Sequence, residues 1–494
     1  MAPVCECSIN LSGVNAHRIT LLHVFALFLL TACGAHVSAQ TDSVVIQDVT
    51  VIDSTGAPPM PHVSLSVVGG KIKSIIPASQ MPTVRNGQRA LDGHGRFLIA
   101  GLWDMHVHSL SKNRPDRFFP LFIANGITGI RDMGGDIPLS QVAQLKNEIT
   151  VGSRVGPEIF ASGPILEGAQ PFWPFSLVVK NEADAHRVVN LLVAEKADFL
   201  KVYDTLSREA YLGIAIQAGQ AHVSFVGHVP NAVTPSDASQ LGQKSIEHLW
   251  GIPNYASSSP EALKKMKQAA DDADDPGAAR DLYYKLNGVI LATYDPNKAS
   301  ALLRQFARNN TWQAPTLLVL RSYALIHDPA QRKDPRLAYI PNDILNFWFS
   351  MSEHPDARND EIRWRMFMRD VKIVEAMHAA HVPLLAGTDT PNPYSYPGFS
   401  LPEELELLVS AGLSPMEALQ TATLRAAEFR GVQRYLGSIE PGKVANLVLL
   451  DANPLEDIRN LKRVRAVMFH GQILDRQRLD DLLAAQKAHD LRKP

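Results

Sequence analysis

Two histidines close together in the sequence have the spacing of metal ligands. His106 and His108 stand at the end of an apolar segment that begins at Leu102, as expected for a buried strand. Side chains two residues apart on a strand point to the same face, so both imidazoles can bind one ion. The chain has 17 histidines, and such a pair arises easily by chance. The pair becomes informative only together with other ligand-type residues.

Other residues that can bind metal also follow short apolar segments. Lys201, His228, His248 and Asp389 each stand at the carboxyl end of a predicted strand. In a barrel of parallel strands, the carboxyl ends of the strands meet at the rim where active sites are built. We therefore expect these side chains and the histidine pair to lie at one place.

The elements that would position these residues alternate between strands and helical segments. The candidate strands are residues 102–107, 127–132, 159–162, 199–202, 223–227, 244–247, 312–318 and 383–386. Alternation of this kind is typical of an α/β fold, and eight parallel strands are what a closed (β/α)8 TIM barrel requires. The sequence thus predicts such a barrel over residues 98–431. Its last helix is marked by a capping box at Ser414 and Glu417, and Gly431 follows its end.

Both ends of the chain have the character of β structure. Residues 43–53, 63–68 and 71–76 form short strand-like segments separated by Gly and Pro turns, and residues 444–450 and 464–469 do the same at the other end. We expect residues 40–97 and 432–494 to pair into one composite accessory β domain, a small β-sandwich built from both chain ends.

Residues 1–39 are predicted to be an export signal. Residues 19–32 are almost continuously apolar and lead into the small-residue pattern Val37 to Ala39. A membrane span needs roughly 20 apolar residues, so a permanent transmembrane span is not expected. An alternative is a lipoprotein signal, with Cys33 lipidated after cleavage. The chain's 3 cysteines all lie in this leader, so we expect a periplasmic or secreted body without disulfides.

Composition limits the kind of partner. The chain has 494 residues, of which 46% are hydrophobic, enough for a large core. The 48 basic and 50 acidic residues give a net charge of -2 without a long run of one sign. This balance argues against nucleic acid or an anionic membrane surface as the partner. A small-molecule substrate is expected, and a homo-oligomer is left open.

Several motifs together resemble a known family. They are Gly101–His108, Gly126–Gly135, Ser245–His248, Ala386–Asp389 and Leu436–Lys443. The chain resembles the amidohydrolase superfamily, in its branch of imidazolonepropionase-like and prolidase-like (Xaa-Pro dipeptidase-related) enzymes. The resemblance covers nearly everything between Val44 and Leu474.

The resemblance implies a site with two divalent metal ions. His106, His108 and Asp389 would bind the more buried ion, and His228 and His248 the other. Lys201 would bridge both after carboxylation by CO2, because an ammonium cannot bind a metal whereas a carbamate offers two anionic oxygens. Zinc is expected for such a mixed shell of nitrogen and oxygen ligands. Asp389 is the expected catalytic residue, which takes a proton from the attacking hydroxide and passes it to the leaving nitrogen.

The resemblance also predicts a reaction class. We expect hydrolysis of an amide or peptide bond in a small substrate, such as a dipeptide or an N-acyl amino acid. One alternative is opening of a cyclic amide such as an imidazolone, or of a lactone. Lys201 argues against the closest version of it, because imidazolonepropionases use one metal and need no bridging lysine. A further alternative is a metal-binding barrel without turnover.

Candidate substrate contacts lie in the loops after the strands. Tyr203 and Trp250 would face the site, and Arg321 could hold a substrate carboxylate in a bidentate pair; ordinary packing or solvation is the alternative for each. The loops are rich in aromatic residues: Phe172, Trp173, Phe175, Tyr203, Trp250, Tyr394 and Tyr396. We expect such a wall to exclude water and to favour an apolar or aromatic substrate side chain.

Overall fold

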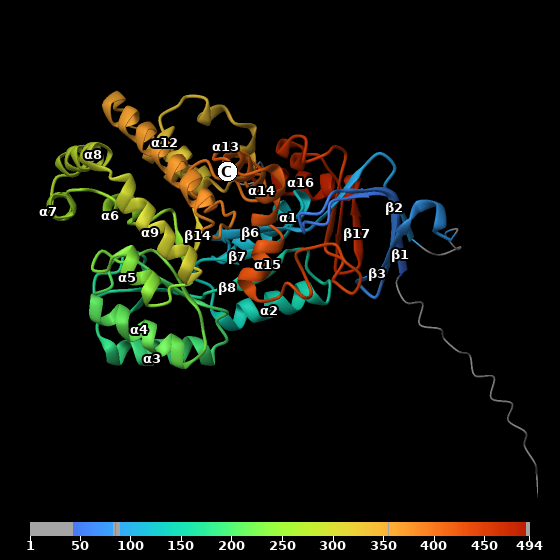
Figure 1. The fold of residues 1–494 in the computed structure, drawn as a ribbon, viewed down its shortest axis with the longest axis horizontal. Helices are drawn as coiled ribbons and strands as arrows, with labels where there is room; N and C mark the ends of the chain where they lie inside the picture. Colours follow the sequence, from blue (N-terminus) through green and yellow to red (C-terminus); the bar gives the residue numbers. More distant parts are fainter. Residues whose placement is uncertain (1–42, 83, 85–88, 354, 491–494) are drawn as a thin grey trace, which may run out of the picture. The chain divides into compact units, whose positions relative to one another are not determined.

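The computed structural model describes residues 43–490, except 83, 85–88 and 354. These residues form an α/β fold with parallel sheets, as predicted (Figure 1). The predicted export signal and the lipidation site at Cys33 lie outside the described residues. Over the described part of the chain, no helix combines the length and the apolar character needed to cross a membrane.

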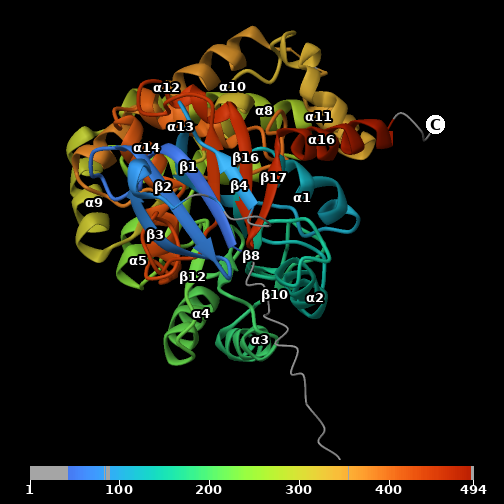
Figure 2. The same ribbon diagram turned by 90° about the vertical axis from the view of Figure 1, so that its right-hand side faces the viewer.

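One sheet joins both ends of the chain. Its strands are β1 (Ser43–Val51), β2 (Met60–Val68), β3 (Lys71–Pro77), β4 (Arg89–Asp92), β5 (Phe97–Ala100), β15 (Leu447–Leu450), β16 (Val464–Phe469) and β17 (Gln472–Asp475). Their order is β17-β16-β15-β5-β1-β2-β3, with β4 paired to β1 (Figure 2). The antiparallel pair β5 and β15, in which Ala100 lies opposite Leu447, connects the two ends. The sandwich arrangement and the boundaries at 97/98 and 431/432 stay predictions.

Parallel strands form the other sheets. Strands β6 (Leu102–Val107), β7 (Ile127–Asp132) and β8 (Glu158–Ala161) form one sheet. The second contains β9 (Ile165–Glu167), β10 (Leu177–Val178), β11 (Leu200–Val202), β12 (Phe225–Gly227), β13 (Ser245–Glu247) and β14 (Trp312–Ala314), in the order β10-β9-β11-β12-β13-β14. The strands predicted between residues 102 and 247 are all present, whereas β9 and β10 were not predicted.

Residues 383–390 lie between these sheets. The amide of Leu385 donates to the carbonyl of Gln313 at 2.9 Å, and the amide of Met105 donates to the carbonyl of Ala386 at 2.8 Å. On the other side, the amide of Asp198 donates to the carbonyl of Ala161 at 2.9 Å, which joins β8 to the segment before β11. Within the predicted strand 383–386 the structure has one isolated parallel bridge, from Leu384 to Gln313, and a second bridge pairs Thr390 with Val107, so there is no regular strand here.

The predicted strand 312–318 is wrong beyond residue 314. Strand β14 ends at Ala314, and helix α10 (Leu317–Ala324) begins three residues later. The buried carboxylate of Glu404, on helix α13 (Leu401–Ser410), accepts hydrogen bonds from the amides of Leu317 and Leu318 at 3.0 and 2.7 Å. This distant carboxylate satisfies the free amides at the start of α10, which is why an apolar, strand-like sequence is helical here.

The remaining helices follow the strands. They are α1 (Arg114–Ala124), α2 (Leu139–Thr150), α3 (Glu182–Ala194), α4 (Arg208–Gln220), α5 (Pro235–Gln240), α6 (Ile252–Tyr255), α7 (Pro260–Asp271), α8 (Pro276–Thr293), α9 (Pro296–Asn309), α11 (Asn342–Met351), α12 (Ala357–Ala379), α14 (Pro415–Thr421), α15 (Leu424–Arg430) and α16 (Arg476–Asp490). The capping box of Ser414 and Glu417 begins α14, and Gly431, in the left-handed region, ends α15. Both predicted signals are confirmed, with a break between α14 and α15.

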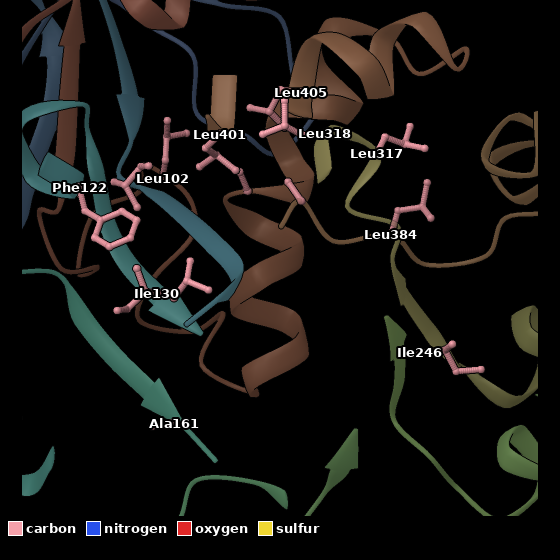
Figure 3. Packing of buried hydrophobic residues seen from close by; sticks show 14 of the residues in the cluster. Leu102, Phe122, Ile130, Ala161, Ile246, Leu317, Leu318, Leu384, Leu401 and Leu405 are labelled. Carbon is pink, nitrogen blue, oxygen red and sulfur yellow. The ribbon is translucent and has the colours of Figure 1, made fainter. Parts of the chain in front are cut away.

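The parallel strands are buried on both faces. Leu102 and Val107 of β6 pack with the surrounding helices in the largest hydrophobic cluster. Figure 3 shows part of that cluster, including Leu102, Phe122 and Ile130. Trp103 and Met105 of β6 belong to a second cluster, which also contains Phe199, Val226, Trp312 and Leu385. Burial on both faces explains why these strands read as continuous apolar segments in the sequence.

Candidate metal centre

Asp389 lies among the predicted histidine ligands. Its Oδ1 atom is 3.4 Å from Nε2 of His106 and 3.3 Å from Nε2 of His108, and its Oδ2 atom is 3.8 Å from Nε2 of His248. One ligand atom from each of His106, His248 and Asp389 lies within 4.8 Å of the others. These atoms come from three separate segments, which the strand ends bring together.

His228 and Lys201 lie beside this group. The ring centroids of His228 and His248 are 5.1 Å apart. Lys201 is buried on β11, next to β12, whose last residue is followed by His228. The charge of Lys201 is close enough to contribute to lowering the pKa of both His106 and His228, although burial is the larger cause. All the predicted ligands are therefore gathered at one place.

Each candidate histidine has its Nδ1 atom engaged by another group. The partners are Glu247 Oε2 for His106 (2.9 Å), the Gly134 carbonyl for His108 (2.8 Å), Asp204 Oδ1 for His228 (2.8 Å) and Thr316 Oγ1 for His248 (2.6 Å). A carboxylate or carbonyl acceptor places the ring proton on Nδ1 and leaves the Nε2 lone pair for a metal. The arrangement is that of metal ligands held by a supporting layer of hydrogen bonds.

Two buried polar atoms at the centre fit a metal site. Among the described residues, Nε2 of His106 and Oδ1 of Asp389 are buried and have no hydrogen-bond partner. An unpaired buried polar atom costs on the order of 1–3 kcal/mol, and a bound cation would satisfy both. The donor set therefore fits a divalent cation.

Burial controls the protonation of the site. It holds the pKa of His106, His228 and His248 well below the ordinary value, which favours the neutral imidazoles that bind metals. Burial opposes ionisation of Asp389, but the neighbouring His248 and His108 lower the pKa of this carboxyl group overall. Burial also lowers the pKa of Lys201 to about 8.

The local backbone explains the residue types around the ligands. His248 and Asp389 have φ of 57° and 54°, in the left-handed region where non-glycine residues are uncommon. Gly387 packs against His106 so closely that a Cβ atom at this position would lie 2.6 Å from Cβ of His106. The stretch from Ala386 to Asp389 thus combines a glycine that permits close approach with a strained residue that aims its carboxylate.

Sequence reasoning missed the residues that support the ligands. Glu247 accepts hydrogen bonds from His106 and, at 2.7 Å, from Arg131 Nη2. Asp204 and Thr316 contact Nδ1 of His228 and His248. Glu247 stands directly before His248 in the motif Ser245–His248, so its position in the sequence could have indicated it. Asp204 and Thr316 have no comparable mark, because their partners are distant in the sequence.

Of the candidate substrate contacts, Tyr203 and Trp250 lie beside a proposed ligand, whereas Arg321 pairs with another side chain. Tyr203 and Trp250 each stack on His228, with centroid distances of 4.1 and 4.3 Å and interplanar angles of 27° and 26°. Two nearly parallel rings at these distances must lie on opposite faces, so they sandwich the imidazole. Arg321 lies on α10, where its Nη2 donates to Glu403 at 3.2 Å. Its guanidinium therefore already has a carboxylate partner.

The α/β fold and the group of possible metal ligands are those expected of a metal-dependent hydrolase. Residues 366–474 match the Amidohydrolase family. The chain is similar to an imidazolonepropionase from Shouchella clausii, 39% identical over 103 residues, which is 20% of this chain and 23% of the relative. It is also similar to an ochratoxinase from Aspergillus niger, 23% identical over 398 residues, which is 75% of this chain and 73% of the relative. The match over residues 366–474 and these relatives support the predicted resemblance to the amidohydrolase superfamily.

Solved structures share the fold along most of the chain. A bottromycin amidohydrolase is similar with a TM-score of 0.73 and 21% identity, covering 91% of each chain. A Xaa-Pro dipeptidase with bound methionine is similar with a TM-score of 0.60 and 18% identity, covering 88% of this chain and all of that one. The expected hydrolase class acting on carbon–nitrogen bonds is confirmed at the level of the family.

Proposed function

We propose that this protein is a binuclear metal-dependent amidohydrolase that cleaves an amide or peptide bond of a small substrate. The observation that most supports it is the shared geometry of the four histidines. Each engages a protein group through Nδ1, which leaves Nε2 for a metal, and three of these Nε2 atoms lie within 3.8 Å of an Asp389 oxygen. A set of satisfied core histidines would have no reason to share this arrangement.

The residues divide between two ions as the family resemblance implies. His106, His108 and Asp389 would hold the more buried ion, and His228 and His248 the other. Zinc suits this mixed shell. When bound, such ions would lower the pKa of a metal-bound water to about 7 and polarise the substrate carbonyl.

Lys201 is proposed as the residue that would hold both ions. Its side chain is buried among the histidines, where a permanently protonated ammonium would oppose metal binding. The ammonium loses one proton, and the neutral amine then reacts with CO2 to form a carbamate and releases a second proton, which gives a ligand with a carboxylate-like pair of oxygens. The same side chain then favours the metal instead of repelling it.

Asp389 is the proposed proton carrier. Its carboxylate lies beside His106 and His108 and is held by a strained backbone, so its oxygens face the reaction centre. In this position it takes a proton from the nucleophile during attack and gives it to the leaving nitrogen. The net reaction adds one water across the amide bond.

The site is proposed to stand on a closed (β/α)8 barrel. The support is the hydrogen bonding that runs from β14 through residues 384–390 to β6, and from β8 to the segment before β11. The shared inner cluster of Trp103, Phe199, Val226 and Trp312 is the packed interior that such a barrel requires.

We also propose that the protein is exported, as a periplasmic, secreted or lipid-anchored enzyme.

A linear amide is the favoured substrate. The likeness to an ochratoxinase spans 75% of this chain, and the similar structures include a Xaa-Pro dipeptidase. The likeness to an imidazolonepropionase spans only 20% of the chain, so a cyclic amide or a lactone is the second candidate. The Xaa-Pro dipeptidase, which resembles this chain over most of its length, supports dipeptides as the first substrates to test, with N-acyl amino acids beside them.

The test combines metal analysis with a substrate panel. We expect about two divalent ions per chain by elemental analysis, and zinc-dependent hydrolysis of at least one dipeptide or N-acyl amino acid. Removal of the metal by a chelator should abolish hydrolysis and lower the melting temperature, because a ligand that binds only the folded state stabilises it. One ion per chain would refute the binuclear centre. A zinc-loaded protein that hydrolyses only cyclic amides or lactones, or nothing on the panel, would refute the linear amidase.

A further inference from the structure

Three aromatic side chains are grouped on the loop between β9 and β10. The ring centroids of Phe172 and Trp173 are 5.0 Å apart, and those of Trp173 and Phe175 are 5.7 Å apart. Phe172 is 70% exposed and Trp173 is 37% exposed. We call Phe172, Trp173 and Phe175 the aromatic lip. Neighbouring exposed aromatic rings are unfavourable in water, so such a group commonly marks a binding surface.

The loop that bears the aromatic lip is anchored by a buried carboxylate. Oε2 of Glu167 accepts hydrogen bonds from the Trp173 amide at 3.0 Å and from the Ser176 hydroxyl at 2.7 Å. The Gly168 amide donates to Thr205 Oγ1 at 2.9 Å, which ties the start of the loop to the segment after β11. The lip is therefore held in place before any ligand binds, which reduces the entropy cost of binding.

The loop of the aromatic lip is joined to the segment that packs on the metal centre. The Gly168 amide of this loop donates to Thr205 Oγ1, two residues after Tyr203. Tyr203 in turn stacks on His228. The lip is therefore tied, through the segment after β11, to a residue that packs on a proposed metal ligand.

The other aromatic residues predicted for the wall expose less ring surface to a substrate. Tyr394 and Tyr396 are buried and pack against Trp348. Trp250 and Tyr203 each use a ring face on His228. Of the seven aromatic residues expected from the sequence, the exposed ring surface belongs mainly to the lip.

We propose that the aromatic lip is the subsite for an apolar, preferably aromatic, side chain of the substrate, and that Glu167 positions it. This inference rests on the proposed function and adds its substrate class. The occupant is one side chain of the molecule whose amide bond lies at the metal centre. Its ring replaces water on Phe172 and Trp173, and Glu167 acts through the loop without touching the substrate.

The test compares two substrates that differ only in the side chain. We expect the zinc-loaded enzyme to hydrolyse N-acetyl-L-phenylalanine with a higher kcat/KM than N-acetyl-L-alanine, and Trp173→Ala to reduce this ratio by about tenfold or more. Glu167→Gln should reduce the ratio in the same direction while the metal content is unchanged. Trp364→Ala removes a ring on α12 that is 41% exposed and should leave the ratio as in the parent.

A binding measurement separates the lip from the proposed reaction. Calorimetric titration of the zinc-loaded protein with 3-phenylpropionate and with propionate should show a preference for the aromatic acid that Trp173→Ala removes. If no amide is hydrolysed but this preference and its loss are observed, the proposed function fails and the subsite remains. If amides are hydrolysed and Trp173→Ala leaves both preferences unchanged, the subsite is refuted and the function remains.

Discussion

Glu247 accepts a hydrogen bond from Nδ1 of His106 at 2.9 Å, with both side chains fully buried. Glu247 ends β13 and His106 lies on β6, so the contact spans two parallel strands that are not neighbours. The same carboxylate is paired with Arg131. It therefore orients one proposed ligand while its charge is balanced within the core, and its backbone leads directly into the next ligand, His248.

We predict that Glu247→Gln weakens zinc binding about 10- to 100-fold, the usual effect of removing a carboxylate behind a metal-bound histidine. The measurement is competition with a chromophoric chelator, made on protein whose folding is verified by thermal unfolding. The matched control is Asp360→Asn, because Asp360 accepts from Nδ1 of His327 at 2.7 Å away from the proposed ligands. Equal zinc affinity in both variants and the parent would refute the orienting role of Glu247.

We predict that Asp389→Asn lowers kcat by about 10²- to 10⁴-fold while much of the metal is retained. The amide still offers an oxygen to the ion but cannot accept and return a proton. Steady-state kinetics and elemental analysis of the same preparation provide the measurement, with Asp48→Asn on β1 as the carboxylate control. A variant that keeps its metal and turns over at nearly the parent rate would show that another group carries the proton.

The sequence-based hypothesis that Arg321 binds a substrate carboxylate predicts that Arg321→Gln raises KM for a substrate with a free carboxylate but not for the matched amidated substrate. Arg336→Gln is the control, because Arg336 also pairs with Glu403, at 2.6 Å, and is held by Asp334 as well. An equal change on both substrates would mean that Arg321 serves only its ion pair with Glu403.

A buried carboxyl group away from the metal centre should make stability depend on pH. Burial raises the pKa of Asp370, on α12, to about 8. An acid with a raised pKa binds its proton more tightly in the folded state, so its contribution favours folding at low pH. That contribution is lost as the pH rises from about 4 to about 8.

We therefore predict that Asp370→Asn is more stable than the parent at pH 8 by on the order of a few kcal/mol, and that the difference shrinks toward pH 5. Denaturant unfolding at both pH values measures it. The exposed carboxylate of Asp343, which pairs with Arg114, is the control through Asp343→Asn. A difference that does not change with pH would contradict the assignment to Asp370.

Much of the fold and of the candidate site could be predicted from the sequence. The strands between residues 102 and 247 are buried on both faces, so each appears as an apolar segment that local reading detects. The proposed ligands His106, Lys201, His228 and His248 stand at or directly after the ends of such segments. Because parallel strands align their carboxyl ends, the pattern along the chain was enough to bring these residues to one place.

Tertiary structure alone decided which groups support and surround the ligands. Asp204 and Thr316 orient His228 and His248 through contacts between separate strand ends, and Glu404 converts a predicted strand into the start of α10. A side chain's partner depends on the three-dimensional path of the chain, whereas local patterns report only burial and periodicity. For the same reason, the sequence could not show which aromatic residues of the loops are exposed. Only their packing distinguishes the aromatic lip from Tyr203 and Trp250, which stack on His228.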